Sequence, residues 1–381
     1  MMKVFLAIVS LLVVAILIVP MSSNNPVSTE GRTTPSTAYN IYFGDLHSHT
    51  GYSDGYGTPA EAYQSAINGG ADYYATTDHA HSLSGAEWAQ TIADAANYSS
   101  PTFVALPGYE YWLMANIGEM NVFGCSVLPP APATLGNQFV RLENFYDWLA
   151  NQSSTTSAMW NHPNYMTHGY PGGEFDNYAY YTAGRDLPIN MYEICNWGSY
   201  VWQDDLNWES TYINALDHGW HIMPTASSDT HATNWFASGY DVRTALLAPS
   251  LTAADLYDAM RACRGYATQD KNLRIIYTLN GEIMGSELSP AESTYTASIH
   301  IEDPDGVATD AVTMVEILSD GGAVVASHSF NSDIVDWTVA LSSSTSHYYY
   351  VRVTTVSSLV APAVAYGSGP TAWTAPVWTG R

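Results

Sequence analysis

Two histidines one residue apart, His47 and His49, end an apolar run that starts near Tyr42. Side chains alternate along a β-strand, so the two imidazoles of a His-x-His sequence leave the strand on one side and can reach the same metal ion. Asp54 follows in a Gly-rich turn and adds an oxygen ligand. Alone, this sequence is as consistent with a histidine-rich strand end as with a metal site. The metal interpretation therefore depends on whether the rest of the chain supplies more ligands.

Between about residues 42 and 268, short apolar strands alternate with amphipathic helical patterns. Repeated strand–helix units are typical of a parallel sheet or barrel. We expect strands at residues 42–49, 72–78, 103–111, 158–162, 191–195 and 222–228. We expect helices at residues 58–67, 84–97, 144–151, 205–217 and 252–263, with Thr58, Ser84 and Thr252 as N-caps.

Residues of metal-ligating types recur where these predicted strands end. In an α/β barrel, the carboxyl ends of the strands carry the chemistry. Beyond the first strand, the residues found there are His79, Glu110, His162, Asp229 and His231. Glu193 lies on the strand predicted at 191–195. Chance would scatter such residues through the loops, so their recurrence at strand ends indicates one multinuclear metal site.

After about residue 271, β-rich runs replace the strand–helix alternation. They lie at residues 272–279, 295–301, 313–318, 324–330, 337–341 and 348–355, separated by turns such as Asp303-Pro304-Asp305-Gly306. This pattern predicts a small β-sandwich. We therefore divide the chain into an α/β barrel over residues 40–268 and a C-terminal β-sandwich domain over residues 269–381.

The N-terminus has the features of an export signal. Lys3 precedes an apolar run of about 16 residues, Val4 to Val19, and a Ser/Thr/Pro/Asn-rich stretch follows from Ser22. The run is shorter than the roughly 20 residues of a membrane span. We expect residues 1–21 to be a signal peptide or, alternatively, a retained N-terminal anchor, and residues 22–39 to be a flexible linker. The protein is then extracellular or at the cell surface, and a retained anchor is the one membrane contact that we expect.

The charge balance limits the partners. The chain has 11 Lys and Arg against 36 Asp and Glu, a formal net charge of −25. A protein with so few cations is a poor ligand for nucleic acid, because it cannot neutralise a run of phosphates. We therefore expect a small-molecule substrate rather than a nucleic-acid polymer. Nothing in the sequence indicates the oligomeric state.

Three cysteines, Cys125, Cys195 and Cys263, are too few and too widely spaced for a disulfide framework or a zinc knuckle. Two interpretations remain open: one disulfide with a free thiol, or three buried thiols that pack as small hydrophobes.

The motifs and their order resemble the PHP family, the polymerase and histidinol phosphatase domain. The resemblance covers about residues 40–268. It rests on Asp-x-His-x-His-Thr at 45–50 with Ser-Asp-Gly at 53–55, Thr-Asp-His at 77–79, Pro-Gly-x-Glu at 107–110, Asn-His-Pro at 161–163 and Ser-Asp-x-His at 228–231. The ending Ala-Trp-Thr-Ala-Pro-Val-Trp at 372–378 is similar to an exported branch of the family that includes carbamate and ester hydrolases and carries a C-terminal β domain.

The resemblance implies a distorted seven-stranded (β/α) barrel that holds two or three divalent metal ions (Zn, Mn or Fe) with a bridging hydroxide. It implies that Asp45 and Asp78 orient the histidines. By motif match, the metal ligands are His47, His49, Asp54, His79, Glu110, His162, Asp229 and His231, and Glu119 is a further candidate ligand. Among them, Asp54, His79, Asp229 and His231 are the candidate catalytic residues.

The sequence departs from the family pattern at Glu119. Family members of this type often have Gly-His-x-Asn where this chain has Gly-Glu-Met-Asn at 118–121. Glu119 can ligate a metal and favour a harder ion, or it can leave one site empty. A cationic phosphate clamp is also not obvious. Its candidates are Arg185, Arg243, Arg261 and Arg264, and for each of them structural ion pairing is an equally good interpretation.

These features point to an exported metal-dependent hydrolase of ester bonds, most simply a phosphoesterase. The shortage of cations supports an alternative, a metallohydrolase of carbamates, carboxylic esters or amides, because a phosphate would meet an acidic surface. A third interpretation is a non-catalytic surface or assembly protein that a metal-bound barrel stabilises. The intact set of ligand residues favours the first two.

Overall fold

Strands make up most of the regular structure, with fourteen in one sheet and four in a second. The computed structural model describes residues 38–113, 117–163, 174–196, 209–236, 241–289, 291–306, 310–342, 346–356 and 370–380. The predicted signal or anchor segment (1–21) and residues 22–37 of the predicted linker lie outside them. Within the described residues, no helix has the length and apolar character needed to cross a membrane.

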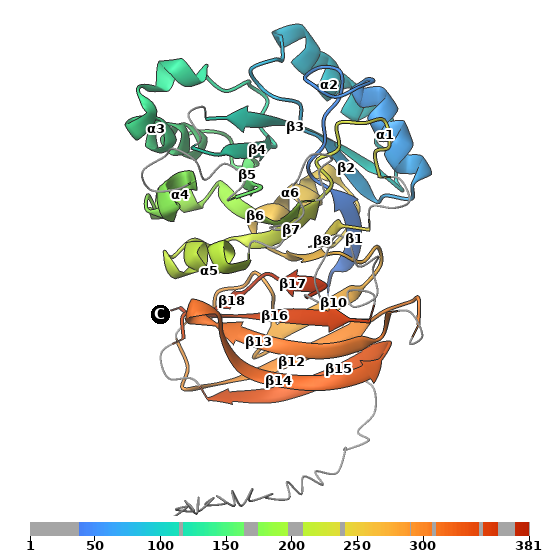
Figure 1. The fold of residues 1–381 in the computed structure, drawn as a ribbon, viewed down its shortest axis with the longest axis vertical. Helices are drawn as coiled ribbons and strands as arrows, with labels where there is room; N and C mark the ends of the chain where they lie inside the picture. Colours follow the sequence, from blue (N-terminus) through green and yellow to red (C-terminus); the bar gives the residue numbers. More distant parts are fainter. Residues whose placement is uncertain are drawn as a thin grey trace, which may run out of the picture. The chain divides into compact units, whose positions relative to one another are not determined.

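Seven strands carry the first half of the larger sheet, and they run side by side in chain order (Figure 1). β1 pairs in parallel with β2 and β2 with β3, β4 is antiparallel to both of its neighbours, and β5, β6 and β7 are again parallel. The bounds are β1 (Asn40–Asp45), β2 (Tyr73–Thr76), β3 (Val104–Trp112), β4 (Glu119–Phe123), β5 (Ser157–Asn161), β6 (Ile189–Asn196) and β7 (Met223–Ser227).

The first and seventh strands meet again beyond their carboxyl ends. Ser48 and Thr230 form an isolated parallel bridge. The backbone N–H of Asp229 donates to the carbonyl of His47, and that of His49 to the carbonyl of Thr230, both at 2.9 Å. The loops that follow β1 and β7 are therefore held directly against each other.

The helices are α1 (Pro59–Asn68), α2 (Gly85–Tyr98), α3 (Gln138–Ala150), α4 (Ala183–Asp186), α5 (Glu209–Asp217) and α6 (Ala253–Arg261), with short 3₁₀ turns η1 (Pro132–Leu135), η2 (Glu174–Tyr178) and η3 (Asp320–Gly322). The predicted caps are confirmed. The hydroxyls of Thr58, Ser84 and Thr252 each accept the N–H of the residue three positions on. Each such cap contributes about 1 kcal/mol to helix stability.

The predicted strand–helix alternation is present, but the sheet is mixed rather than parallel. Among the described residues of this region, three strands were not predicted: β4, β8 (Arg243–Ala248) and β9 (Gly265–Thr268). β4 returns antiparallel to β3 after only a short connection, and β8 pairs antiparallel with both β1 and β9. A short connection allows only an antiparallel return, because a parallel crossover needs a dozen or more residues.

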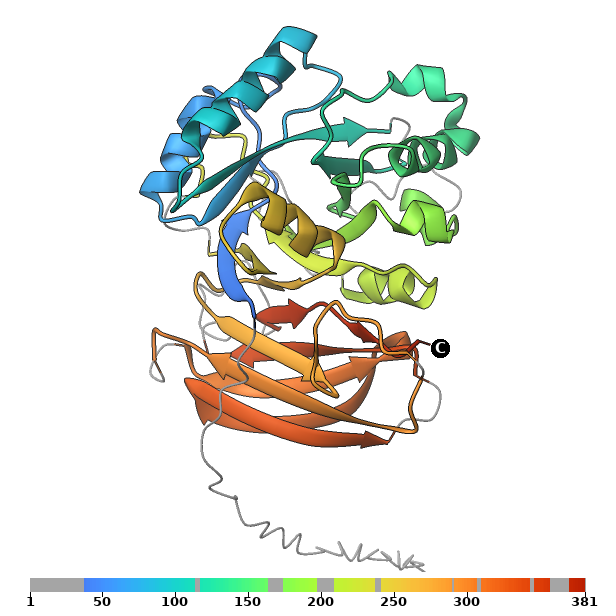
Figure 2. The same ribbon diagram turned by 180° about the vertical axis from the view of Figure 1, so that it is seen from behind.

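The C-terminal strands form the second sheet and extend the first. The second sheet contains β10 (Arg274–Leu279), β11 (Glu282–Ile283), β12 (Thr294–Glu302) and β15 (Ile334–Ser342). The larger sheet continues through β13 (Val312–Ser319), β14 (Ala323–Ser332), β16 (Tyr348–Thr355), β17 (Ala372–Thr374) and β18 (Val377–Trp378). Figure 2 shows the two groups of strands lying against each other. The hydroxyl of Tyr277 on β10 donates to the carbonyl of Tyr349 on β16 at 3.1 Å.

β17 pairs antiparallel with β9, so backbone hydrogen bonds cross the predicted boundary between residues 268 and 269. Residues 37–381 form one compact unit. The overall class is thus α/β with a large sheet and few helices, and the division into two domains stays a prediction.

Large aromatic side chains fill the interior. Trp160 and Trp220 are fully buried with ring centroids 5.0 Å apart, and Nε1 of Trp160 donates to the hydroxyl of Tyr146 at 2.8 Å. All three cysteines are free and buried, which confirms the second of the two cysteine interpretations.

Candidate metal centre

The centre begins where β1 ends. The carboxylate of Asp45, the last residue of β1, accepts the backbone N–H of His47 at 3.0 Å. The backbone bond from His49 to Thr230 fixes the next turn. His47 and His49 are both fully buried, with Nε2 atoms 3.3 Å apart. The predicted His-x-His pair therefore points into the protein on one side of the chain.

Two carboxylates face this histidine pair. Oε1 and Oε2 of Glu110, on β3, lie 3.3 Å from Nε2 of His47 and 3.2 Å from Nε2 of His49. Oδ1 of Asp229, just beyond β7, lies 3.3 Å and 3.2 Å from the same two nitrogens. Residues from the first, third and seventh strands thus meet at one point.

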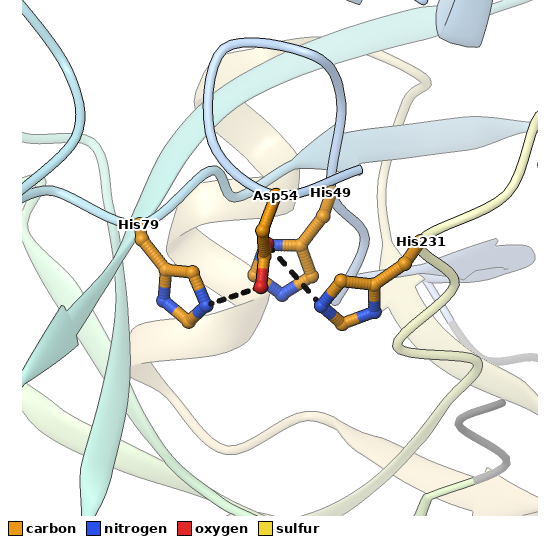
Figure 3. Close-up of side chains that lie close together, drawn as sticks. All are labelled: His49, Asp54, His79 and His231. Atoms are coloured by element: carbon orange, nitrogen blue, oxygen red, sulfur yellow. Dashed lines mark ion pairs between the residues drawn. The ribbon is translucent and has the colours of Figure 1, made fainter. Parts of the chain in front are cut away.

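Asp54 forms the solvent-facing side of the centre. Its carboxylate lies 3.6 Å from Nε2 of His79 and 3.3 Å from Nε2 of His231, and Figure 3 shows it between these two rings with His49 behind. The Asp54 side chain is 58% exposed, against 15% and 17% for His79 and His231. A small molecule can therefore approach the centre at Asp54.

The remaining predicted ligands lie on the opposite flank. Nε2 of His162 is 3.3 Å from Oε1 of Glu110 and 3.3 Å from Oε2 of Glu119, which projects from β4. One ligand atom each of His79, Glu110 and Glu119 lie within 4.8 Å of one another. The structure thus brings all nine predicted ligand residues into one cluster, with Glu119 in a position from which it can ligate.

Two of these residues hold unusual backbone conformations. His162 has φ of 28° and Asp229 has φ of 46°, in the left-handed region that residues other than glycine seldom adopt. Asp and His tolerate this region better than most residues. Such conformations persist at functional sites where surrounding contacts enforce them. At Asp229 one such contact is its N–H bond to His47.

Glu193 is a buried carboxylate that contacts two of the predicted ligand residues and was not itself predicted as a ligand. Oε1 of Glu193 lies 3.0 Å from Nδ1 of His47, and its Oε2 accepts the backbone N–H of His162 at 2.7 Å. Nδ2 of Asn196 donates to Oε2 of Glu193 at 3.1 Å and to Oδ2 of Asp229 at 3.2 Å. The available sequence signal was the position of Glu193 on a predicted strand next to those carrying ligands.

Two buried asparagines also orient ligands. Nδ2 of Asn161 donates to Oε1 of Glu110 at 2.6 Å and to Oδ1 of Asn121 at 2.9 Å. Asn121 in turn donates to the carbonyl of Leu46 at 3.0 Å. This chain of amides ties β3, β4 and β5 to the end of β1.

The expected role of Asp45 and Asp78 is wrong in one respect, because neither carboxylate contacts an imidazole. Asp45 accepts the backbone N–H groups of His47 and Ser228 at 3.0 and 3.1 Å. Asp78 accepts the N–H and hydroxyl of Thr50, both at 2.7 Å, and the hydroxyl of Ser53 at 2.6 Å. Both therefore hold the backbone of the ligand-bearing loops, and Glu193 is the carboxylate that orients a histidine ring.

The electrostatics of the cluster favour positive charge. Burial alone would lower the pKa of His49, but the carboxylates of Asp229 and Glu110 raise it to about 10. Burial opposes charge on Glu110 too, yet His47 and His79 hold its pKa well below the usual range. His231 and His79 likewise lower the pKa of Asp54. Buried carboxylates that stay ionised attract any available cation, whether a proton on an imidazole or a metal ion.

The directions of the ligand atoms test whether the residues fit a metal. Nδ1 of His79 and Oδ1 of Asp229 are buried and form no hydrogen bond, although each lies 3.1–3.3 Å from an oppositely charged group. These atoms converge without the alignment of a hydrogen bond. Donor atoms arranged around a shared cation have this geometry, and the mixed imidazole and carboxylate set suits Zn, Mn or Fe. The residues therefore fit divalent metals.

The candidate anion-binding arginines are engaged elsewhere. Arg185 pairs with Asp147 at 2.7 Å and Glu143 at 3.2 Å, both on α3. Arg243 is buried over the ring of Phe236. Arg261 donates to the carbonyl of Thr156, and Arg264 pairs with Asp258. The structural interpretation holds for Arg185 and Arg264. Among the described residues, no ion pair joins any of the four arginines to a residue of the cluster.

His81 flanks the exposed side of the centre. Its ring centroid lies 5.3 Å from that of His79 and 5.4 Å from that of Trp112. Burial and the neighbouring His79 lower the pKa of His81. A neutral imidazole therefore borders the face on which Asp54 is exposed.

No family model and no curated protein matches the chain. Several solved structures are similar to it. A two-domain protein from Bacteroides vulgatus, described as containing a predicted PHP-like metal-dependent phosphoesterase, is 15% identical, with 89% of this chain and 96% of that chain covered and a TM-score of 0.46.

The second, a candidate metal-dependent phosphoesterase from Bifidobacterium adolescentis, is 14% identical, with coverage of 50% and 88% and a TM-score of 0.30. The third, an amidohydrolase from Chromobacterium violaceum with bound sulfate and no metal, is 17% identical, with coverage of 50% and 87% and a TM-score of 0.32. The solved structures similar to this chain thus include one described as containing a predicted PHP-like metal-dependent phosphoesterase and another described as a metal-dependent phosphoesterase.

Proposed function

We propose that this protein is an exported, divalent-metal-dependent hydrolase of small phosphoesters. The observation that carries the proposal is the convergence of five imidazoles and four carboxylates on one buried cluster with a solvent-facing side. The cluster is formed by His47, His49, Asp54, His79, Glu110, Glu119, His162, Asp229 and His231. Overlapping groups of ligand atoms within this set support two or three metal ions.

Divalent metals bound there would supply an activated water and stabilise the charge that develops on the ester oxygens. The protein's own contribution is positional. Glu193 fixes the ring of His47, and Asn161 fixes Glu110, so the buried ligands are held before metal arrives. Such supporting contacts typically raise metal affinity 10–100-fold.

The exposed side of the cluster is the proposed reaction face. Asp54 lies between His79 and His231 and is open to solvent, so its ionised carboxylate can act as a base toward a molecule that approaches there. Asp229 contacts both buried histidines from the same side of the cluster as His231. We propose Asp54, His79, Asp229 and His231 as the catalytic residues.

A second candidate function is hydrolysis of a carbamate, carboxylic ester or amide at the same centre. It is supported by the four arginines that are candidates for binding a phosphate, because each of them contacts residues that are not part of the cluster. A dianionic phosphate would rely on the metals for most of its attraction, whereas a neutral ester needs no clamp. A non-catalytic metal-stabilised surface protein is the third candidate.

Turnover separates these functions. Protein loaded with Mn, Zn or Fe is assayed with bis-p-nitrophenyl phosphate and p-nitrophenyl acetate. Faster turnover of the phosphodiester supports the first function, and turnover of the acetate alone supports the second. Metal binding without turnover of either supports the third. His47→Ala is the control, and full activity in that variant would show that the site assignment is wrong.

We also propose the finer architecture, with β1 to β7 as a distorted seven-stranded (β/α) barrel and the C-terminal strands as a β-sandwich. The barrel is supported by the Ser48–Thr230 bridge and by contacts of β7 with β8 and β9. The sandwich is supported by the contact of Tyr277 with Tyr349 between the two sheets. Export is proposed from the apolar run Val4 to Val19 alone, and N-terminal sequencing of secreted material tests it.

A further inference from the structure

Three buried aspartates that are not part of the histidine-rich centre lie close to one another. Asp270 follows β9, Asp303 follows β12 and Asp310 precedes β13, so three separate segments supply them. One carboxylate oxygen of each lies within 4.8 Å of the others. Their exposed fractions are 6%, 2% and 9%. Three like charges in so small a buried volume repel one another unless something neutralises them.

The protein itself supplies little compensation. Asp270 accepts the backbone N–H groups of Asn272 and Leu273, both at 2.9 Å. Oδ1 of Asp303 accepts the N–H of Asp305 at 3.0 Å, but its Oδ2 is buried and has no hydrogen-bond partner. Throughout the described parts of the chain, no lysine, arginine or histidine forms an ion pair with any of the three.

Lys271, next to Asp270 in the chain, is paired with a different carboxylate, because its Nζ lies 2.7 Å from Oδ2 of Asp305. In the loop that contains Asp270 and Lys271, the side-chain oxygen Oδ1 of Asn272 is also buried and has no hydrogen-bond partner. The amide of that side chain donates to Oδ1 of Asp305 at 3.2 Å. The acidic triad thus contains one buried, unpartnered carboxylate oxygen, and a neutral oxygen without a partner lies two residues after Asp270 in the chain.

Burial is the main cause that raises the pKa of Asp303 to about 7, and the neighbouring carboxylates of Asp270, Asp310 and Asp305 contribute to the same shift. Burial also raises the pKa of Asp270. The triad therefore binds a positive species readily, either a proton or a cation.

We propose that Asp270, Asp303 and Asp310 bind a divalent calcium ion that is separate from the histidine-rich centre. The ligand set consists of oxygens alone, which suits a hard ion and disfavours zinc or iron. Calcium accepts carboxylates from irregular loops and tolerates six to eight oxygens, whereas magnesium demands a near-octahedral shell. The ion would tie the segment after β9 to the connection between β12 and β13.

The experiment measures thermal unfolding with CaCl₂ as the probe. Protein is stripped with chelator, desalted and reloaded with zinc, so that the histidine-rich centre is filled before calcium is added. CaCl₂ is then titrated to about 10 mM, a range that covers weak extracellular calcium sites. MgCl₂ is titrated in parallel, and calorimetry gives the number of calcium ions bound.

We expect calcium to raise the Tm of the wild type by at least about 2 °C. Asp303→Asn should lose this shift, yet in calcium-free buffer it should melt at or above the wild-type Tm, because a buried charge has been removed. A merely misfolded variant would melt lower. Asp310→Asn, at the edge of the triad, should lose the calcium shift as well.

Asp336→Asn is the matched control, since Asp336 is an exposed aspartate of β15 paired with His300. It should keep the full calcium shift. A wild-type Tm that calcium does not change, or an equal shift in Asp303→Asn, would overturn the proposal. An equal shift with MgCl₂ would overturn the assignment to calcium.

Discussion

Oε1 of Glu193 lies 3.0 Å from Nδ1 of His47, and both side chains are completely buried. Nε2 of the same imidazole lies 3.3 Å from Glu110 and from Asp229. The Glu193 contact therefore fixes the ring so that the opposite nitrogen faces the cluster. This arrangement of carboxylate, histidine and metal-facing nitrogen is how proteins set the tautomer and basicity of a histidine ligand.

Replacing Glu193 should weaken metal binding rather than abolish it. We expect Glu193→Gln to lower metal affinity about 10–100-fold, because the amide cannot orient or polarise His47 as a carboxylate does. Competition with a chromophoric chelator measures the change. Glu282→Gln, at an exposed position of β11, is the control. Unchanged affinity in Glu193→Gln would show that the contact with His47 does not tune the site.

Asp54 should matter for turnover and little for folding. Its side chain is more than half exposed, so Asp54→Asn removes a group that contacts His79 and His231 without opening a cavity. We expect kcat to fall about 10²–10⁴-fold and the Tm to stay within about 2 °C of the wild type. Steady-state kinetics on metal-saturated protein and a thermal melt test both parts. A large loss of Tm with normal kcat would contradict the proposed role.

We expect Glu119 to influence how many metals the centre holds. Its carboxylate lies 3.3 Å from Nε2 of His162 and shares a group of ligand atoms with His79 and Glu110. We therefore expect it to ligate, so Glu119→Gln should lower the metal content by elemental analysis and Glu119→His should preserve it. A metal content that rises in Glu119→His would show instead that Glu119 leaves a site vacant.

The metal-free protein should lose stability as the pH rises above neutrality. Folding raises the pKa of His49 from 6.5 to about 10, because the carboxylates of Asp229 and Glu110 outweigh burial. A group with a raised pKa stabilises the native state fully below its unfolded pKa, and this contribution is lost as the pH rises through its folded pKa. The carboxylates of Glu110, Asp54 and Asp229 have lowered pKa values and therefore stay ionised above neutral pH.

Urea denaturation at about pH 7 and about pH 9.5 measures the effect. The free energy of unfolding of metal-free protein should fall between these values, and zinc-loaded protein should lose less, because the metal replaces the proton between the carboxylates. Equal losses with and without zinc would contradict the assignment of His49 to the centre.

Tyr146, on α3, should stabilise the packing of this helix against β5 through a buried hydrogen bond. Its hydroxyl accepts a hydrogen bond from Nε1–H of Trp160 at 2.8 Å. Tyr146→Phe leaves that donor unpaired, and we expect a loss of about 1–3 kcal/mol in the free energy of unfolding. Tyr56→Phe, at a position 69% exposed, should change it by less than about 0.5 kcal/mol.

Local signals in the sequence predicted much of this structure. Thr58, Ser84 and Thr252 mark helix starts because a capping hydroxyl acts within one turn of its own position. The ligand residues at strand ends were likewise predictable from order and type, because parallel strands bring their carboxyl ends to one edge. Eight of the nine predicted ligands lie on β3 or follow β1, β2, β5 or β7, whereas Glu119 is the first residue of the antiparallel strand β4.

Other features depend on contacts that sequence order does not reveal. Glu193 sits in mid-strand, and only the approach of β1 to β6 places it behind His47. The positive φ of His162 and of Asp229 is enforced by neighbouring segments rather than by residue type. β4 was missed because all five of its residues are buried, so it lacks the alternation that identifies a half-exposed strand.

The bridge between Ser48 and Thr230 has a consequence for where the protein acquires its metals. Asp45 and Ser228, hydrogen-bonded across this junction, are 183 residues apart in the chain. A nascent chain that has not yet extended past His231 lacks part of the ligand set, however well its first strands have formed. The complete centre can therefore be loaded only after the chain has extended at least to His231. The metal content should reflect the ion supply of the compartment in which the whole chain finally assembles, rather than that of the place where translation begins.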